Sequence, residues 1–296
     1  MLLFLLMSKE TIQAYYRLTK PGIIKGNLFS AAAGFLLAAN GNIDFLQLLI
    51  ALAGIAFVIA SGCVANNYID VDIDSKMKRT DKRSLVTGEI SGRSALIYSA
   101  SLGLIGLAIL GALVNYLTML IGIAGFVFYV AVYGYFKRKS VHGTLVGSIS
   151  GSLPPVAGYV AVTGRIDLGA VLLFVALTAW QMPHFYAIAM YRSHDYKDAS
   201  LPVLPVVSGK KHTIIQIISY IVLFIVASML LTVYGYTGIS YTAVVLGIGI
   251  WWLSIGLRGL SINLKNSDAW AKEVFKSSLF VLIVFSVMIS VDFWLP

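Results

Sequence analysis

The sequence predicts an all-α, polytopic membrane protein with nine transmembrane helices in one domain over residues 1–296. Three observations predict this class. Hydrophobic residues make up 58% of the chain and charged residues only 12%, whereas a soluble domain usually carries about 25% charged residues. Nine apolar stretches come close to the length of a spanning helix, which is about 20 residues. Lysine and arginine are concentrated in alternate loops, as expected of a membrane protein with a fixed orientation.

The same composition excludes several other classes of protein. A chain this apolar is not disordered, collagenous or a coiled coil. The single cysteine, Cys63, excludes an internal disulfide framework and a cysteine-rich zinc or iron–sulfur site. A net charge of +9 would suggest nucleic acid binding in a soluble protein. Here the positive charge lies beside membrane-length stretches, so we expect no nucleic acid partner.

The predicted spans are separated by polar or turn-forming clusters. Asn40-Gly41-Asn42 and Thr163-Gly164-Arg165 are two of them, and such clusters commonly mark turns. The first stretch is short and carries Lys25 and Asn27 near its start. The predicted spans cover residues 23–40, 45–68, 94–114, 116–135, 144–162, 168–190, 213–234, 239–258 and 274–294.

The positions of the basic residues predict the orientation. We place residues 1–20 in the cytoplasm as an N-terminal segment, so that the loops alternate sides and the C-terminus lies outside. Of the 22 lysines and arginines, 21 then lie on the cytoplasmic side and only Arg165 lies outside. Because these residues are enriched in cytoplasmic loops, and an error of one span would scramble the pattern, the count supports nine spans and a cytoplasmic N-terminus.

The first residues do not resemble a targeting segment. Residues 1–6 are apolar, but the run is shorter than a signal-peptide core and no basic residue precedes it. Met7 is an alternative start. Since no organelle-targeting feature is recognisable, we expect the chain in a bacterial plasma (inner) membrane.

Two cytoplasmic loops, 70–93 and 192–212, are predicted to form the active site. Asn66 precedes the first loop, and Asp70 and Asp74 lie in it; the three residues are spaced four apart. They share one face if the second span continues as a helix. Like charges at this spacing repel each other, so a positive group must compensate the two carboxylates.

A second acidic window, with Asp195 and Asp198, follows the sixth span. An even number of spans separates the windows, so both must face the same side. Acids with arginine and lysine beside them suit Mg²⁺ and phosphate, because Mg²⁺ takes few carboxylates together with water and phosphate oxygens and basic groups neutralise the remaining phosphate charge. Ordinary surface pairing is the alternative that we retain for Asp72, Asp81, Asp198 and Glu89.

Several motifs together resemble one family. Asn-x-x-x-Asp-x-x-x-Asp after the second of nine spans, with an acidic loop after the sixth, is similar to the UbiA-type intramembrane prenyltransferases. The segment Trp180-Gln181-Met182-Pro183-His184 is similar to the motif of the branch that adds a farnesyl group to haem B. The resemblance covers residues 17–295 and includes Thr19-Lys20-Pro21-Gly22, Ser61-Gly62-Cys63, Arg79-Thr80, Pro154-Pro155, Tyr191-Arg192 and Leu201-Pro202. In one departure, Ala199 stands four residues after Asp195, where many members carry a second aspartate.

The resemblance implies a fold and a reaction. The fold places the spans around a central cavity that is open to lipid. In the reaction, farnesyl diphosphate ionises, and its carbon cation, haem B and water give haem O and diphosphate. Mg²⁺ is the implied cofactor, and the implied binding partners are farnesyl diphosphate, haem B and membrane lipid. A terminal oxidase or a haem A synthase is the protein partner that would receive the product.

The resemblance also implies residue roles. Metal ligation falls to Asn66, Asp70, Asp74 and Asp195, and Asn66 would also contact diphosphate. Further diphosphate contacts are assigned to Lys78, Arg79, Arg83 and Lys137. Tyr133 is counted with the three aspartates as catalytic, because it would face the allylic cation, which an aromatic ring stabilises by about 0.5–2 kcal/mol. The alternative for Tyr133 and Lys137 is an interfacial tyrosine and a lysine of a cytoplasmic loop.

His184 and Arg192 are the predicted haem-binding residues. His184 follows Pro183 within a span, and an ionisable residue inside the membrane is a functional candidate. It would contact the acceptor or ligate its iron; bonding to a neighbouring helix is the structural alternative. Arg192 would pair with a haem propionate or with Asp195.

Other features have structural interpretations. Gly143, Gly147 and Gly151 repeat every four residues, which is typical of close helix packing in membranes. Cys63 is expected to pack rather than react, because a thiolate forms poorly in apolar surroundings.

Two other functions remain open. A relative that prenylates a quinone precursor or another aromatic acceptor would share the diphosphate site. A transporter of an anionic solute or a metal would typically have broken helices at the membrane midplane, whereas the acids here cluster at one face.

Overall fold

The computed structural model describes residues 8–264 and 267–296. Within these residues, nine helices are long and apolar enough to cross a membrane. They coincide with the predicted spans, which confirms the all-helical fold class. The apolar run 1–6, Met7 and Lys265 lie outside the described residues.

The helices extend beyond several of the predicted spans. The seventh begins at Gly209 rather than at residue 213, and the ninth begins at Ser267 rather than at residue 274. Apolar length marks only the part of a helix that lies in lipid, and a helix can continue beyond it with polar side chains in water. The nine spans are built from ten α-helices, because α6 and α7 belong to one span. These are α2 (Pro21–Ala39), α3 (Phe45–Ile69), α5 (Gly92–Ile109), α6 (Tyr116–Val127), α7 (Tyr133–Lys139), α8 (Gly143–Thr163), α9 (Leu168–Tyr191), α12 (Gly209–Val233), α13 (Ile239–Arg258) and α14 (Ser267–Val291).

Two spans contain π-helical segments. Leu110–Val114 continues α5, and Phe128–Val132 joins α6 to α7 within one span. A π segment adds a residue to the helical turn and changes which side chains share a face, and such segments are frequent at functional sites. The second one directly precedes Tyr133.

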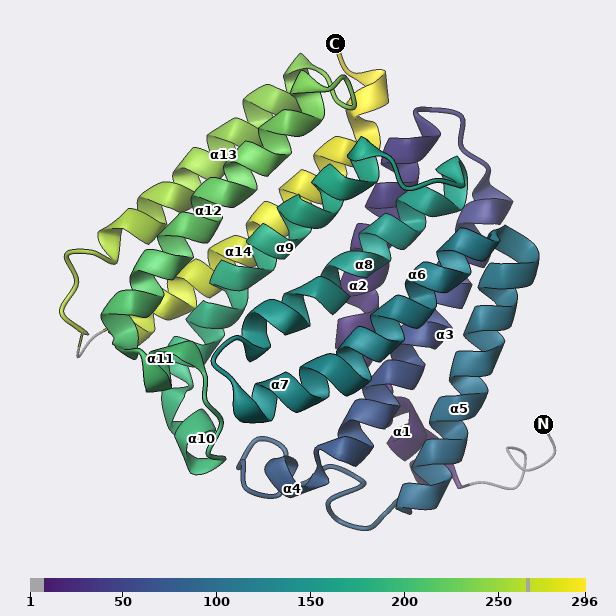
Figure 1. Cartoon of the computed structure of the whole chain (residues 1–296), viewed down its shortest axis with the longest axis vertical. Coiled ribbons are helices and arrows are strands. Elements are labelled where there is room, and N and C mark those ends of the chain that lie inside the picture. Colours follow the sequence, from purple (N-terminus) through teal and green to yellow (C-terminus); the bar gives the residue numbers. More distant parts are fainter. Residues whose placement is uncertain (1–7, 265–266) are drawn as a thin grey trace.

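The spans form one bundle with α13 at one edge and α5 at the other (Figure 1). α2 packs against α8, α3 against α5, and α9 against α8, α12 and α14. α8 and α9 are the most buried spans. Large apolar side chains on the outer helices, such as Leu46 and Leu104, are about 70% exposed, as a lipid-facing surface requires.

Glycines allow α2 and α8 to approach closely. A Cβ added at Gly34 would lie 2.1 Å from the Pro155 carbonyl oxygen, and one at Gly158 would lie 1.9 Å from the Ala31 carbonyl oxygen. Pro154, Pro155 and Pro183 lie inside helices that continue through them.

In the part of the chain that the structure describes, four short α-helices lie outside the spans: α1 (Lys9–Leu18), α4 (Val71–Asp74), α10 (Ser193–Asp198) and α11 (Leu204–Val207). α1 was not predicted from the sequence; the Ser8 hydroxyl caps it by accepting a hydrogen bond from the Thr11 amide at 3.2 Å. α4 and α10 lie at the same end of the bundle, and the C-terminus lies at the opposite end (Figure 1).

Candidate active site

A cavity of about 610 Å³ lies between the helices, and its lining changes from polar to apolar. At one end it is lined by Lys20, Asn66, Asp70, Asp74, Arg83 and Lys137. Away from these groups the lining is largely apolar and aromatic and includes Ile55, Phe126, Leu177, Trp180, Phe185 and Leu282. Such a cavity suits a molecule with an anionic head and an apolar tail.

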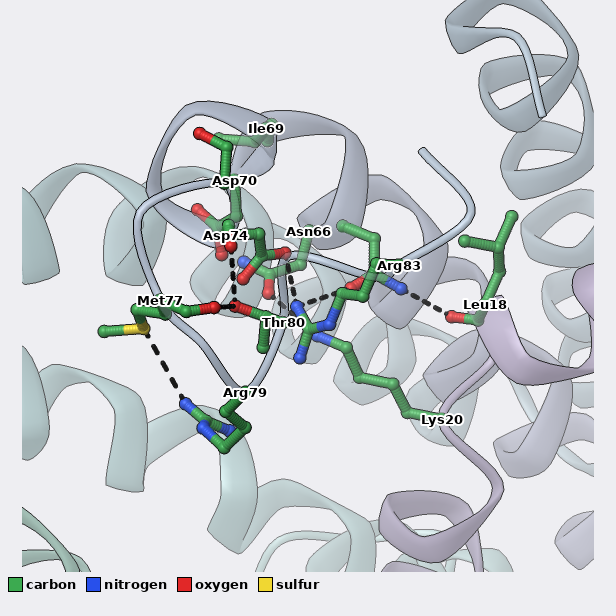
Figure 2. Close-up of polar contacts among 12 residues, drawn as sticks. Leu18, Lys20, Asn66, Ile69, Asp70, Asp74, Met77, Arg79, Thr80 and Arg83 are labelled. Carbon is green, nitrogen blue, oxygen red and sulfur yellow. Dashed lines mark hydrogen bonds and ion pairs between the residues drawn. The ribbon is translucent and has the colours of Figure 1, made fainter. Parts of the chain in front are cut away.

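Asp70 and Asp74 are buried at the polar end, 9% and 5% exposed, which argues against a surface role. Lys137 forms an ion pair with Asp70, and an Arg138 guanidinium nitrogen lies 3.4 Å from the same carboxylate. Arg83 pairs with Asp74 (Figure 2). The compensating charges therefore come from α7 and from the loop after α4.

Asn66, Asp70 and Asp74 keep their predicted helical spacing although the helix is interrupted between α3 and α4. α3 ends at Ile69 and α4 begins at Val71. Across the break, the Asp70 amide donates to the Asn66 carbonyl at 3.0 Å, and the Asp74 amide donates to the Asp70 carbonyl at 2.8 Å. The four-residue spacing therefore persists, and all three side chains line the cavity.

Asn66 is held by residues that sequence reasoning did not assign to the site. The Lys20 ammonium donates to the Asn66 amide oxygen at 3.3 Å, and the Tyr129 hydroxyl donates to it at 3.5 Å. The buried Asn66 amide nitrogen has no partner among the described residues. Burial lowers the pKa of Lys20 to about 8, and Lys20 has a left-handed backbone at φ 54°, which is costly for a residue other than glycine.

Tyr129, Tyr133 and Lys137 form a ladder along one side of the cavity. The two tyrosine rings stack with centroids 5.9 Å apart, and the Lys137 ammonium lies 5.1 Å from the Tyr133 ring centroid. The predicted placement of Tyr133 and Lys137 together is therefore observed. Tyr129 precedes Tyr133 by four residues, as Tyr133 precedes Lys137, and this repeat was the signal that could have identified Tyr129 as a third member.

α8 fits against this ladder through its glycines. A Cβ at Gly143 would lie 2.7 Å from the Lys137 Cα atom, and one at Gly147 would lie 3.0 Å from the Tyr133 ring. The repeat therefore provides close helix contact, as its spacing predicts.

Of the other residues predicted to bind diphosphate or metal, Arg79 lines the cavity, whereas Lys78 and Asp195 do not. Arg79 lines the cavity, and a guanidinium nitrogen lies 3.9 Å from the Met77 sulfur (Figure 2). Lys78 and Asp195 are absent from the described lining, although Tyr196, next to Asp195, is part of it. No group of three or more histidine, cysteine or acidic side chains able to share a metal ion occurs within the described part of the chain.

An apolar cluster joins the two loops. Ile73 and Met77 pack with Ala199, and Tyr196 and Leu201 pack against them. Ala199 is 6% exposed, so the position where related sequences carry an aspartate here holds the loops together. Burial also raises the pKa of Tyr196.

Of the two predicted haem-binding residues, His184 lines the cavity and Arg192 does not. His184 lines the cavity, its Nδ1 atom is 2.8 Å from the Ser278 hydroxyl, and its ring stacks on Trp180 at 5.1 Å. Arg192, outside the described lining, lies over the Tyr191 ring at 5.6 Å.

Two of the four acids in question, Asp72 and Glu89, form the surface ion pairs that the alternative interpretation expects. Asp72 and Glu89 are exposed. Arg138 donates to Asp72 at 2.7 Å, and this hydrogen bond lowers the pKa of Asp72. Glu89 pairs with Arg17 at 3.7 Å. Cys63 is buried, as expected, and lines the cavity.

Comparisons with known proteins agree on one family. The profile of the UbiA prenyltransferase family matches residues 27–281. The chain is 49% identical over 283 residues to a protohaem IX farnesyltransferase of Yersinia pseudotuberculosis serotype O:1b, with 95% of each chain covered. It is 48% identical to protohaem IX farnesyltransferase 1 of Shewanella frigidimarina, with 95% of this chain and 93% of the relative covered.

Solved structures share the fold at lower sequence identity. A digeranylgeranylglyceryl phosphate synthase matches with a TM-score of 0.79 at 22% identity and covers 96% of this chain and 99% of its own. A UbiA homologue from Archaeoglobus fulgidus, bound to GPP and Mg²⁺, matches with a TM-score of 0.70 at 18% identity and covers 94% and 99%.

Proposed function

The chain belongs to the UbiA prenyltransferase family, and we propose that it transfers a farnesyl group from farnesyl diphosphate to a vinyl group of haem B. Water takes part, and the products are haem O and diphosphate. The relatives that are 48–49% identical over 95% of this chain carry the name protohaem IX farnesyltransferase, which supports this choice of donor and acceptor.

The observation that carries the proposal is the single cavity with two chemically different ends. Carboxylates and basic groups at one end suit a diphosphate, and the apolar remainder suits a farnesyl chain and a porphyrin ring. His184 and Trp180 lie in the lining away from the acids, where they support an acceptor site.

The residues at the polar end fit Mg²⁺. Mg²⁺ binds through one or two carboxylates, waters and substrate phosphates, and Asp70 and Asp74 with the Asn66 amide oxygen form such a donor set at the cavity wall. We assign these three residues to the metal, with Asp195 beside Tyr196 as the ligand from the second loop. When bound, the metal would neutralise charge that develops on the departing diphosphate.

In this proposal the basic residues exchange one binding partner for another when substrate binds. Without substrate, Lys137 and Arg83 neutralise Asp70 and Asp74. With metal on the carboxylates, the same cations are free to bind diphosphate oxygens, together with Lys20 and Arg79. Lys78 is the remaining candidate from this loop. Preorganised charge of this kind stabilises a leaving anion in the transition state.

Tyr133 would face the allylic cation that is left behind.

The test is farnesyl transfer by the purified chain. We expect haem B, farnesyl diphosphate and Mg²⁺ to give a farnesylated haem with release of diphosphate, and a chelator to abolish the reaction. Quinone precursors supplied in place of haem B should give no prenylated product. Prenylation of such an acceptor, with haem B left unchanged, would contradict the proposal in favour of a different branch of the family.

A further inference from the structure

Gln181 lines the same cavity as Tyr133. A Cβ at Gly151 would lie 2.1 Å from the Gln181 Oε1 atom. On α8, Gly151 is one turn beyond Gly147, which abuts the Tyr133 ring. Gln181 is therefore about 6 Å further along α8 than the tyrosine that would face the cation, and it lines the same cavity.

The hydrogen bonds of Gln181 determine which way its amide points. Its Nε2 atom donates to the Ser148 carbonyl at 3.3 Å, the Leu177 carbonyl at 3.1 Å and the Ser152 hydroxyl oxygen at 2.8 Å. Two of these partners can only accept, so a reversed amide would set oxygen against oxygen. The side chain is 5% exposed, yet no donor among the described residues reaches Oε1. A fixed acceptor therefore remains available at the cavity wall.

The contacts of Ser278 are the basis on which we assign the proton of His184. The Ser278 hydroxyl oxygen lies 2.6 Å from the Phe275 carbonyl oxygen, to which it can donate, and 2.8 Å from His184 Nδ1. Because a hydroxyl has one proton, donation to the Phe275 carbonyl leaves the Ser278 oxygen to accept from His184 Nδ1, and we assign the proton of the neutral ring to Nδ1. In this tautomer Nε2 keeps a free lone pair. His184 follows Gln181 by three residues, so the two are neighbours on α9. Gln181 bonds to α8 and His184 contacts Ser278 on α14, and both residues line the cavity.

We propose that Gln181 Oε1 and His184 Nε2 hold the water that is added during the reaction. This inference rests on the proposed function. As the C1–O bond of farnesyl diphosphate breaks, its electron pair leaves on the diphosphate, and the π electrons of the vinyl group form the bond to C1. Positive charge is then left on the vinyl carbon that adjoins the porphyrin.

The bound water completes the reaction. A lone pair of the water oxygen forms the new C–O bond, and a water proton passes to His184 Nε2, which later releases it to bulk water. Without a positioned water, the cation instead loses a proton from the adjacent carbon. The product is then an alkene lighter by one water.

The experiment measures the ratio of alkene to hydroxylated product by mass spectrometry. The purified full chain is supplied with haem B, farnesyl diphosphate and Mg²⁺. In Gln181→Met and in His184→Gln we expect this ratio to rise about tenfold, the effect of losing one hydrogen bond to the water. Because a ratio is measured on product already formed, it does not depend on how much of a variant folds.

Gln47→Met is the matched control. The Gln47 amide also bridges two helices, donating to the Ala161 carbonyl at 2.9 Å, but Gln47 is not part of the described cavity lining. We expect the wild-type product ratio in this variant. An unchanged ratio in both Gln181→Met and His184→Gln would overturn the inference while the proposed function stands. No farnesylated haem from the wild-type chain would instead refute the proposed function.

Discussion

At the scale of single residues, the buried carboxylates are the most demanding feature of the site. Asp70 caps the C-terminus of α3 and Asp74 is the last residue of α4, and burying an unpaired carboxylate is costly. Their pairing with Lys137 and Arg83 offsets part of that cost before substrate arrives. The same pairing holds the cations where a diphosphate would need them, so one arrangement serves both stability and binding.

We expect Asp70→Asn and Asp74→Asn each to lower farnesyl transfer by roughly 10²–10³-fold, because each removes a charge that would hold the metal against the developing diphosphate. The measurement is the initial rate of haem farnesylation at saturating Mg²⁺. Asp81→Asn is the control, since Asp81 is exposed in the same loop and lies outside the described lining; its rate should match wild type. Wild-type rates in both site variants would contradict the metal assignment.

Only part of the site could be predicted from the order of residues. Spacing brought Asn66, Asp70 and Asp74 together correctly, because a four-residue repeat is a local property of a helix. The partner of Asp70 is 67 positions away and depends on how α7 packs beside α3, which no local pattern reports. Lys20 was missed for the same reason: in the sequence it is one of many lysines that flank spans.

At the scale of helices, apolar length predicted every span but not its ends or its interior. The π segment Phe128–Val132 changes the face on which Tyr133 lies, and nothing in its composition distinguishes it from α-helix. The amphipathic helix α1 lacks the apolar length that identified the spans. Patterns that depend on lipid contact were therefore predictable, and those that depend on packing between helices were not.

Close packing of α2 on α8 gives a prediction at this scale. Gly158→Ala should destabilise the protein by about 1–3 kcal/mol, because the new Cβ would meet the Ala31 carbonyl oxygen, 1.9 Å away, and backbone must move. The measurement is the thermal unfolding midpoint in detergent.

Gly134→Ala on α7 is the matched control for that substitution. Apart from the backbone of its own helix, no atom of the described residues lies within 4 Å of its added Cβ, and alanine favours helix over glycine by about 1 kcal/mol. Its midpoint should be equal to that of wild type or higher. A Gly158→Ala protein that melts with the wild type would show that α2 and α8 can separate without cost.

At the scale of the whole molecule, the bundle gathers its polar groups at one end. α4 and α10 lie together there, and the C-terminus lies at the other end (Figure 1), as an odd number of spans requires. Because the cavity reaches from this polar end into the apolar part of the bundle, a lipid diphosphate could keep its head near water while its chain stays among apolar side chains.

We predict that the polar end faces the cytoplasm, since 21 of the 22 lysines and arginines belong to that side and only Arg165 to the other. The sequence has a single cysteine, which is buried, so a Cys63→Ser chain offers a background for one new thiol at a time. A membrane-impermeant maleimide should label Arg165→Cys in intact cells and Asp81→Cys only after the membrane is opened. Both positions are exposed, so differences in labelling report the side of the membrane rather than burial. Labelling of Asp81→Cys alone in intact cells would invert the orientation and move the proposed diphosphate site to the outer face, away from a cytoplasmic supply of prenyl donor.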